Sequence, residues 1–275
     1  MIRLHATTSG LVLEHNGRFV RPATDFSIDS LFTAEDPVAS AAAAFANGAA
    51  SDAPSEPAAP IASQEVWAAG VTYLRSKSAR MAESKDAGGG TFYDRVYEAE
   101  RPELFFKGNA VRTAAPGGHV RIRADSKWNV PEPELTLVIN SAGRIFGYTI
   151  GNDMSSRDIE GVNPLYLPQA KVYAGSCAIG PCLVISGTLP GPETEISIEI
   201  RRDGATVFGG TTTVGRIKRP LPSLAEWLFR EDKFPFGAFL MTGTGIVPDD
   251  TFTLKSGDEI RITIAPVGTL VNTVE

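Results

Sequence analysis

The chain has 275 residues, of which 43% are hydrophobic and 21% are charged, and its formal net charge is −6. This is the composition of a globular protein long enough for one large domain and a small one. The acidic balance and the absence of a dense basic run argue against nucleic acid or an anionic membrane as partner. The sequence has no apolar run of bilayer length and no signal-peptide pattern, so we expect a cytoplasmic protein.

Residues 1–60 are predicted to form a small N-terminal domain and a linker. Strands are expected at residues 1–6 and 11–20, followed by a helix over residues 38–46. Residues 49–60 are rich in proline, alanine and serine, which is typical of a linker. Nothing in this part of the chain indicates a chemical role.

Residues 61–275 are predicted to form the main domain. It opens with a buried strand at residues 66–71 and a helix over residues 73–85. Three glycines at residues 88–90 fit a mobile loop over a site and a plain linker equally well. A second helix is expected at about residues 91–99.

The rest of the main domain is dominated by expected strands, at residues 101–107, 182–186, 196–202, 205–208, 239–242, 260–264 and 269–274. Residues 163–171 contain two prolines and are expected to be rigid and irregular. Ser223 and Glu226 predict a capping box for a helix over residues 224–230. Because strands outnumber helices, we predict an α+β, mainly β fold built on a rolled β-sheet.

Acidic residues flank a predicted hairpin in the middle of the main domain. The hairpin consists of strands at residues 135–139 and 145–150, with a turn between them. Glu132 and Glu134 are two residues apart, which puts both carboxylates on one face of an extended chain. Folding the hairpin brings Asp153, just past its second strand, beside them. The sequence therefore predicts that three carboxylates converge.

Two interpretations of these carboxylates remain open. A Glu-x-Glu pair before a strand is most often a solvated edge, and Asn-Asp after a strand is often a turn or a helix cap. The neighbouring strands are apolar, however, and Arg157 and Lys171 supply cations downstream. Carboxylates in close contact repel one another unless a cation joins them. Mg²⁺ would be the first choice, with Mn²⁺ or Ca²⁺ as substitutes.

Other candidate residues have an ordinary structural explanation as well. Glu103 and Lys107 share one face of a predicted strand, and such a pair is usually a surface ion pair. Cys177 and Cys182 lack the spacing of a zinc site and are expected to be buried thiols. Residues 243–245, Gly-Thr-Gly, either meet an anion at a strand end or form a plain turn.

Together these segments resemble the fumarylacetoacetate hydrolase family, in the family's order from about residue 65 to the C-terminus. The matching pieces are ELFFK at 103–107, EPEL at 132–135, GYTIGNDMSSRD at 147–158, Lys171, and TGT at 242–244. The resemblance implies the family's rolled β-sheet, a small α-keto acid as substrate, and a homodimer or homotetramer.

The resemblance also implies roles for individual residues. The family's divalent metal, usually Mg²⁺, is held by residues that match Glu132, Glu134 and Asp153. The expected catalytic residues are Lys171 and Glu103, and the expected substrate-binding residues are Arg157, Thr244 and Lys107.

One departure from the family decides between reaction types. The family's C–C hydrolases carry an Asn-Tyr-x-x-His segment whose histidine activates water, whereas residues 71–76 here read VTYLRS. His119 is the sole histidine of the main domain and does not match. Residues 101–103, 167–171 and 173–181 resemble instead a dehydratase branch of the family.

The resemblance thus implies Mg²⁺-dependent dehydration of a 2-keto-3-deoxy sugar acid, such as 2-keto-3-deoxy-D-arabinonate to 2,5-dioxopentanoate in pentose breakdown. The alternative is a C–C bond hydrolase of a diketo acid. A third hypothesis is a non-enzymatic protein that binds a metabolite. The missing histidine favours the first over the second, and the intact metal triad with Lys171 disfavours the third.

Overall fold

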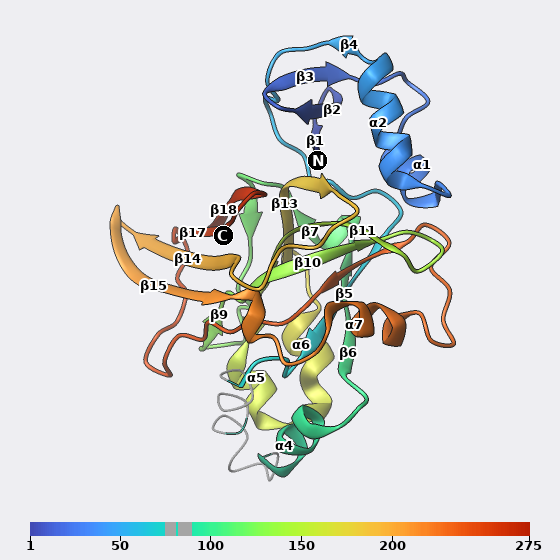
Figure 1. Ribbon diagram of the computed structural model, residues 1–275. Coiled ribbons are helices and arrows are strands. Elements are labelled where there is room, and N and C mark those ends of the chain that lie inside the picture. The colour runs from blue at the N-terminus through green and yellow to red at the C-terminus, as the bar shows by residue number, and fades with distance from the viewer. Residues whose placement is uncertain (75–80, 82–89) are drawn as a thin grey trace.

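The computed structural model describes residues 1–74, 81 and 90–275, and it is mainly β (Figure 1). The large sheet comprises β1 (Ile2–Thr7), β2 (Gly10–His15), β3 (Arg18–Arg21), β4 (Ala49–Ala50), β5 (Glu65–Gly70), β6 (Glu103–Asn109), β7 (Thr113–Ala114), β10 (Pro133–Ile139), β11 (Ile145–Asp153), β13 (Cys177–Ile185) and β16 (Ala238–Met241). The second sheet comprises β8 (His119–Val120), β14 (Glu195–Arg202), β15 (Ala205–Thr213), β17 (Glu259–Ile264) and β18 (Gly268–Val274). A short ladder joins β9 (Asn129–Val130) and β12 (Ser155–Ser156).

Short helices lie at the ends and edges of these sheets. They are α1 (Ile28–Thr33), α2 (Pro37–Asn47), α4 (Gly90–Glu98), α5 (Arg157–Val162), α6 (Leu167–Lys171) and α7 (Leu221–Leu228), with 3-10 turns η1 (Ala110–Arg112), η2 (Pro164–Tyr166) and η3 (Val214–Arg216). No helix within the described ranges is both long and apolar enough to cross a membrane. The predicted α+β, mainly β class is confirmed.

The N-terminal strands extend the large sheet. β1 pairs antiparallel with β13, with Leu4 opposite Leu183, and β2, β3 and β4 follow in order beyond it. Figure 1 shows this part, in blue, stacked above the rest of the molecule with α1 and α2 beside it. The division of the chain into residues 1–60 and 61–275 stays a prediction.

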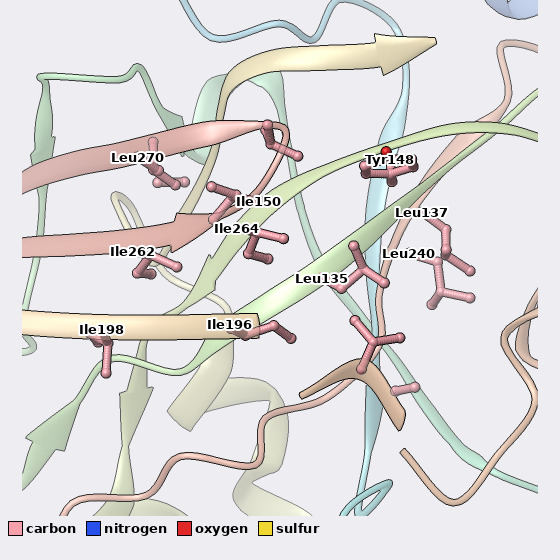
Figure 2. Packing of buried hydrophobic residues seen from close by; sticks show 14 of the residues in the cluster. Leu135, Leu137, Tyr148, Ile150, Ile196, Ile198, Leu240, Ile262, Ile264 and Leu270 are labelled. Carbon is pink, nitrogen blue, oxygen red and sulfur yellow. The ribbon is translucent and has the colours of Figure 1, made fainter. Parts of the chain in front are cut away.

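The main apolar core lies between the two sheets (Figure 2). Leu135 and Leu137 of β10 meet Ile196, Ile262 and Leu270 of the second sheet there, all almost fully buried. These positions alternate along their strands, as expected for strands that turn one face to a core.

A second apolar cluster covers the opposite face of the large sheet. It includes Val138 of β10, Phe239 of β16 and Phe32 of α1. The ring of Phe32 meets that of Phe146 edge to face, with their centroids 5.0 Å apart. The strands β10 and β11 are therefore buried on both faces, and this anchors the hairpin that carries the candidate site.

Most predicted elements are present, and two local predictions are wrong. The proposed capping box fails because α7 begins at Leu221 and no side chain caps it, so Ser223 lies inside the helix. Residues 163–171 are helical rather than irregular. Pro164 is the first residue of η2 and Pro168 is the second residue of α6, and the first turn of a helix needs no N–H from proline.

Other predictions concern residues outside the main sheets. The helix expected at 91–99 is α4. The helix expected at 73–85 and the glycines at 88–90 fall largely outside the described residues. Both cysteines are buried free thiols, as predicted, and burial raises the pKa of each to about 12.

Candidate active site

The hairpin register brings the three predicted carboxylates together. Glu134 lies opposite Gly151, and the backbone N–H of Asp153 donates to the carbonyl of Glu132 over 3.0 Å. Carboxylate oxygens of Glu132, Glu134 and Asp153 lie within 4.8 Å of one another. All three residues are buried, with at most 6% exposed surface, so the solvated-edge interpretation is wrong.

Local sequence explains why the hairpin closes in this register. Its turn is organised by Asn140, whose side-chain oxygen accepts hydrogen bonds from the backbone of Ala142 and Arg144 at 3.1 and 2.9 Å. Gly143 adopts φ +76°, a left-handed conformation that favours glycine. Because Leu135 faces the core between the sheets, Glu134 faces the other side.

Buried cations surround the carboxylates. The Lys171 ammonium lies 2.6 Å from Glu132 Oε2 and 3.0 Å from Asp153 Oδ2. Arg157 Nη2 lies 2.7 Å from Glu132 Oε1, and Lys107 Nζ lies 2.6 Å from Asp153 Oδ1. Three acidic and three basic side chains thus form one charge-balanced cluster in the interior.

The two downstream cations enter from short helices. Arg157 is the first residue of α5, and its backbone N–H donates to the carbonyl of Trp128 at 2.8 Å. Lys171 is the last residue of α6 and has no exposed surface. Pro164 and Pro168 lie in the first turns of η2 and α6. The segment predicted to be irregular is therefore helical, and it positions the ammonium group of Lys171.

Glu134 lies in a different environment from the other two carboxylates. Its Oε2 accepts a hydrogen bond of 2.5 Å from the backbone N–H of Gly243. Burial and repulsion by Asp153 and Glu132 raise the pKa of Glu134 well above its ordinary value. The strand end at Gly243 therefore meets a carboxyl group of the protein itself.

A small cavity opens onto the cluster. It has a volume of about 20 Å³. Its walls are Ala69, Gly70, Val71, Phe105, Glu132, Glu134, Asp153, Arg157, Gly243 and Thr244. Predicted site residues from three separate segments, 132–135, 147–158 and 242–244, thus share one cavity wall. Lys171 lies behind this wall, against two of its carboxylates.

Glu103 of β6 lies next to Gly70, one of the cavity-lining residues. Its carboxylate lies against Gly70, where the Cβ of any larger residue would collide with it. Lys107, further along β6, is fully buried against Asp153, so the interpretation of these two residues as a surface ion pair is wrong. Thr244 is buried, and its hydroxyl exchanges hydrogen bonds of 3.2 Å with the backbone of Ile246.

Three residues at the site were not singled out from the sequence. Phe105 lies two residues from Glu103 on β6, and its ring centroid is 5.9 Å from Lys171 Nζ. Val71 adopts φ +54°, a strained conformation for a β-branched residue, where β5 ends at the cavity. Tyr73 is buried, and burial together with the charge of Glu134 raises its pKa. The period of two along β6 could have identified Phe105.

The donor set fits a hard divalent cation. Three buried carboxylates that repel one another supply only oxygen ligands, which Mg²⁺, Mn²⁺ and Ca²⁺ prefer. Cys177 lies directly opposite Asp153 on β13, but its sulfur is not among the ligand atoms that converge with the three carboxylates. The buried acidic cluster can therefore hold a divalent metal.

Comparison with known proteins agrees with this geometry. Residues 66–275 match the family model described as fumarylacetoacetate (FAA) hydrolase C-terminal. A "Probable 2-keto-3-deoxyxylonate dehydratase" of Haloferax volcanii is 47% identical over 216 residues, which cover 78% of this chain and 73% of that protein. A 2-dehydro-3-deoxy-D-arabinonate dehydratase of Saccharolobus solfataricus is 42% identical over 219 residues, with the same coverage.

A solved structure extends the similarity to the whole chain. It is described as 2-keto-3-deoxy-D-arabinonate dehydratase complexed with magnesium and 2,5-dioxopentanoate. Its TM-score is 0.80 at 33% sequence identity, and the alignment covers all of this chain and 98% of the other.

Proposed function

The chain belongs to the fumarylacetoacetate hydrolase family, and from this premise we propose that it is a lyase that dehydrates a 2-keto-3-deoxy sugar acid. The substrate proposed is 2-keto-3-deoxy-D-arabinonate and the product 2,5-dioxopentanoate. The buried triad of Glu132, Glu134 and Asp153, with Lys171 bonded to two of its members, carries this proposal. The relatives named for the same reaction support it.

The proposed cofactor is one divalent ion held by the three carboxylates, with Mg²⁺ first and Mn²⁺ or Ca²⁺ as substitutes. When bound, such an ion withdraws electrons from the keto oxygen of an α-keto acid and makes the C3–H bond more acidic. The protein's own task is to hold the ligands in place and to move protons.

Dehydration requires one proton to leave C3 and the C4 hydroxyl to leave as water. Lys171 is the proposed base at C3, because its Nζ lies beside two of the proposed metal ligands. Glu103 is the proposed second proton-transfer residue, or holds water, because its carboxylate lies at the cavity wall by Gly70. Reprotonation and tautomerisation then give the aldehyde at C5.

Substrate oxygens need positively polarised partners. Arg157 and Thr244 line the cavity and are proposed to hold the carboxylate and hydroxyl groups. Phe105 forms an apolar part of the same wall and limits water around Lys171. The functional oligomer is proposed to be a homodimer or homotetramer, and the proposed location is the cytoplasm.

A mass balance tests the reaction type in one assay. Incubation with 2-keto-3-deoxy-D-arabinonate should yield a five-carbon dioxo acid that is lighter by one water and reacts with an aldehyde trap. In deuterated water the product should carry solvent deuterium, since tautomerisation reprotonates carbon. A chelator should abolish turnover. Cleavage of a diketo acid into two fragments with gain of water, without turnover of the deoxy sugar acid, would replace this proposal with the C–C hydrolase.

A further inference from the structure

Lys107 is a fully enclosed partner of the carboxylate cluster. Its side chain has no exposed surface. Its Nζ donates hydrogen bonds to the carbonyl oxygens of Met154 at 2.9 Å and Lys171 at 2.5 Å, and forms an ion pair with Asp153 Oδ1 at 2.6 Å. An ammonium group has three N–H donors. Three protein oxygens therefore surround the Lys107 ammonium group, one for each N–H, although the family resemblance assigned Lys107 to substrate binding.

The backbone of β6 is distorted at this residue. In the pairing with β5, Gly108 lies opposite Val66 and Phe106 lies opposite Trp67, so Lys107 is an extra residue without a partner across the ladder. This is a β-bulge, a feature that redirects a side chain and is common beside active sites. The distortion aims Lys107 at the end of β11.

Two partners of Lys107, Asp153 and Lys171, lie on different elements and have different proposed roles. Asp153 ends β11 and is a proposed metal ligand, whereas Lys171 ends α6 and is the proposed base. The two oxygens of Asp153 are divided between the two lysines, Oδ1 to Lys107 and Oδ2 to Lys171. Lys107 thus contacts one oxygen of the Asp153 carboxylate and the backbone carbonyl of Lys171 with a single ammonium group.

We propose that Lys107 is a positioning residue that aligns the metal ligand Asp153 with the base Lys171, rather than a residue that binds substrate. This inference rests on the proposed metal site but on no particular substrate. It also explains why a buried lysine and a bulge occur together in a strand that contributes Phe105 to the cavity wall.

Removal of Lys107 should change the affinity of the site for a divalent cation, and the direction of that change distinguishes a positioning role from a general charge effect. If Lys107 acted only through its positive charge, its removal would leave the site more negative and would tighten the binding of a cation. If it orients Asp153, its removal frees that carboxylate and weakens binding. Partners that orient metal ligands typically contribute 10–100-fold to metal affinity.

The experiment measures Mn²⁺ binding by electron paramagnetic resonance in the full-length Lys107→Met variant, without substrate. We expect Mn²⁺ affinity to fall by about 10-fold or more. In turnover assays at saturating metal, we expect kcat to fall while KM stays within about twofold. Unchanged or tighter Mn²⁺ binding would overturn the inference. So would a raised KM with an unchanged kcat, which is the result expected of a substrate-binding residue.

Two further variants keep the test independent of folding. Thr149→Val removes a buried hydroxyl on β11, the strand that carries Asp153; this hydroxyl donates to the carbonyls of Gly180 and Cys182 at 3.2 and 2.7 Å. It should lower thermal stability and leave Mn²⁺ affinity unchanged. Lys107→Gln keeps a neutral donor on a shorter side chain, and should bind Mn²⁺ more tightly than Lys107→Met. Equal weakening of Mn²⁺ binding in Lys107→Met and Thr149→Val would mean that Lys107 is merely structural. Because Mn²⁺ binding needs no substrate, a wrong substrate assignment would leave this result intact.

Discussion

At the open end of the β10–β11 hairpin, the two faces are opposites in chemistry although they share one backbone. On one face, Leu135, Leu137 and Ile150 pack into the apolar core between the sheets (Figure 2). On the other face and at its open end, Glu134 and Asp153 enter the charged cluster. The apolar face stabilises the hairpin. The stable hairpin in turn holds the buried charges in place, although burying them costs desolvation free energy.

The energetics of the two faces differ in kind. Burial of an aliphatic side chain contributes about 1.5–3 kcal/mol, and the contributions of neighbouring side chains accumulate. A buried ion pair gains little overall, because desolvation offsets most of the attraction, yet removal of one member leaves its partner charged and unpaired. Substitutions on the apolar face should therefore reduce stability, whereas those on the charged face should reduce metal binding and turnover.

The largest expected effect comes from Asp153→Asn. This change removes one proposed metal ligand and deprives Lys107 and Lys171 of a charged partner. We expect turnover to fall by about 10³-fold or more, because a metal acting as a Lewis acid contributes several kcal/mol. Calorimetric titration with Mg²⁺ should show weakened binding. Asp125→Asn, at an exposed carboxylate, is the control and should behave as the native protein. Native Mg²⁺ affinity in Asp153→Asn would refute the metal assignment.

Lys171→Met tests proton transfer on the same face. Loss of a general base typically costs about 10²–10⁴-fold in rate. We expect kcat to fall in this range while substrate still binds in the presence of metal, as measured by calorimetry. Lys127→Met removes an exposed lysine and should leave kcat unchanged. A Lys171→Met enzyme with near-native turnover would place the base elsewhere, with Glu103 as the next candidate.

Leu137→Ala tests the opposite face. Leu137 is fully buried in the core between the sheets, and such truncations cost about 2–5 kcal/mol of unfolding free energy. We expect a lower midpoint of urea denaturation, while kcat of the folded fraction stays native. Val207→Ala, at a side chain with 41% exposed surface, should change stability little. If Leu137→Ala reduced kcat as strongly as Lys171→Met, the two faces would not be separable.

The sequence predicted the charged face better than its surroundings. Period-two spacing and hairpin geometry placed Glu132, Glu134 and Asp153 together correctly, because a turn and two strands are local features. Lys107 is different: its burial depends on a bulge opposite β5 and on carbonyls from two distant segments, which no local pattern encodes. Strands could be recognised from composition, but their order in the sheets could not.

The errors in the helices have a similar origin. Ser223 and Glu226 have the spacing of a capping box, yet Pro220 and the residues after it start α7 earlier, so the pattern falls inside the helix. The prolines at 164 and 168 predict irregular structure, although proline is also favoured at the first position of a helical turn. In both cases one local signal competes with another beside it in the sequence.

Gly143→Ala has the smallest expected effect and acts on the turn that both faces share. Gly143 adopts φ +76°, and a side chain in this conformation costs about 1–2 kcal/mol. Its new Cβ would also lie 3.2 Å from the ring of Phe229, which would have to shift slightly. We expect a modest fall in the urea midpoint with kcat unchanged, because the carboxylates lie at the other end of the hairpin, where Gly243 and the Glu132 carbonyl hold the register. Gly187→Ala is the matched control, since its Cβ would meet nothing within 4 Å. A fall in kcat of Gly143→Ala beyond the loss of folded protein would show that the turn, and not the hydrogen bonds near the cluster, sets the geometry of the charged face.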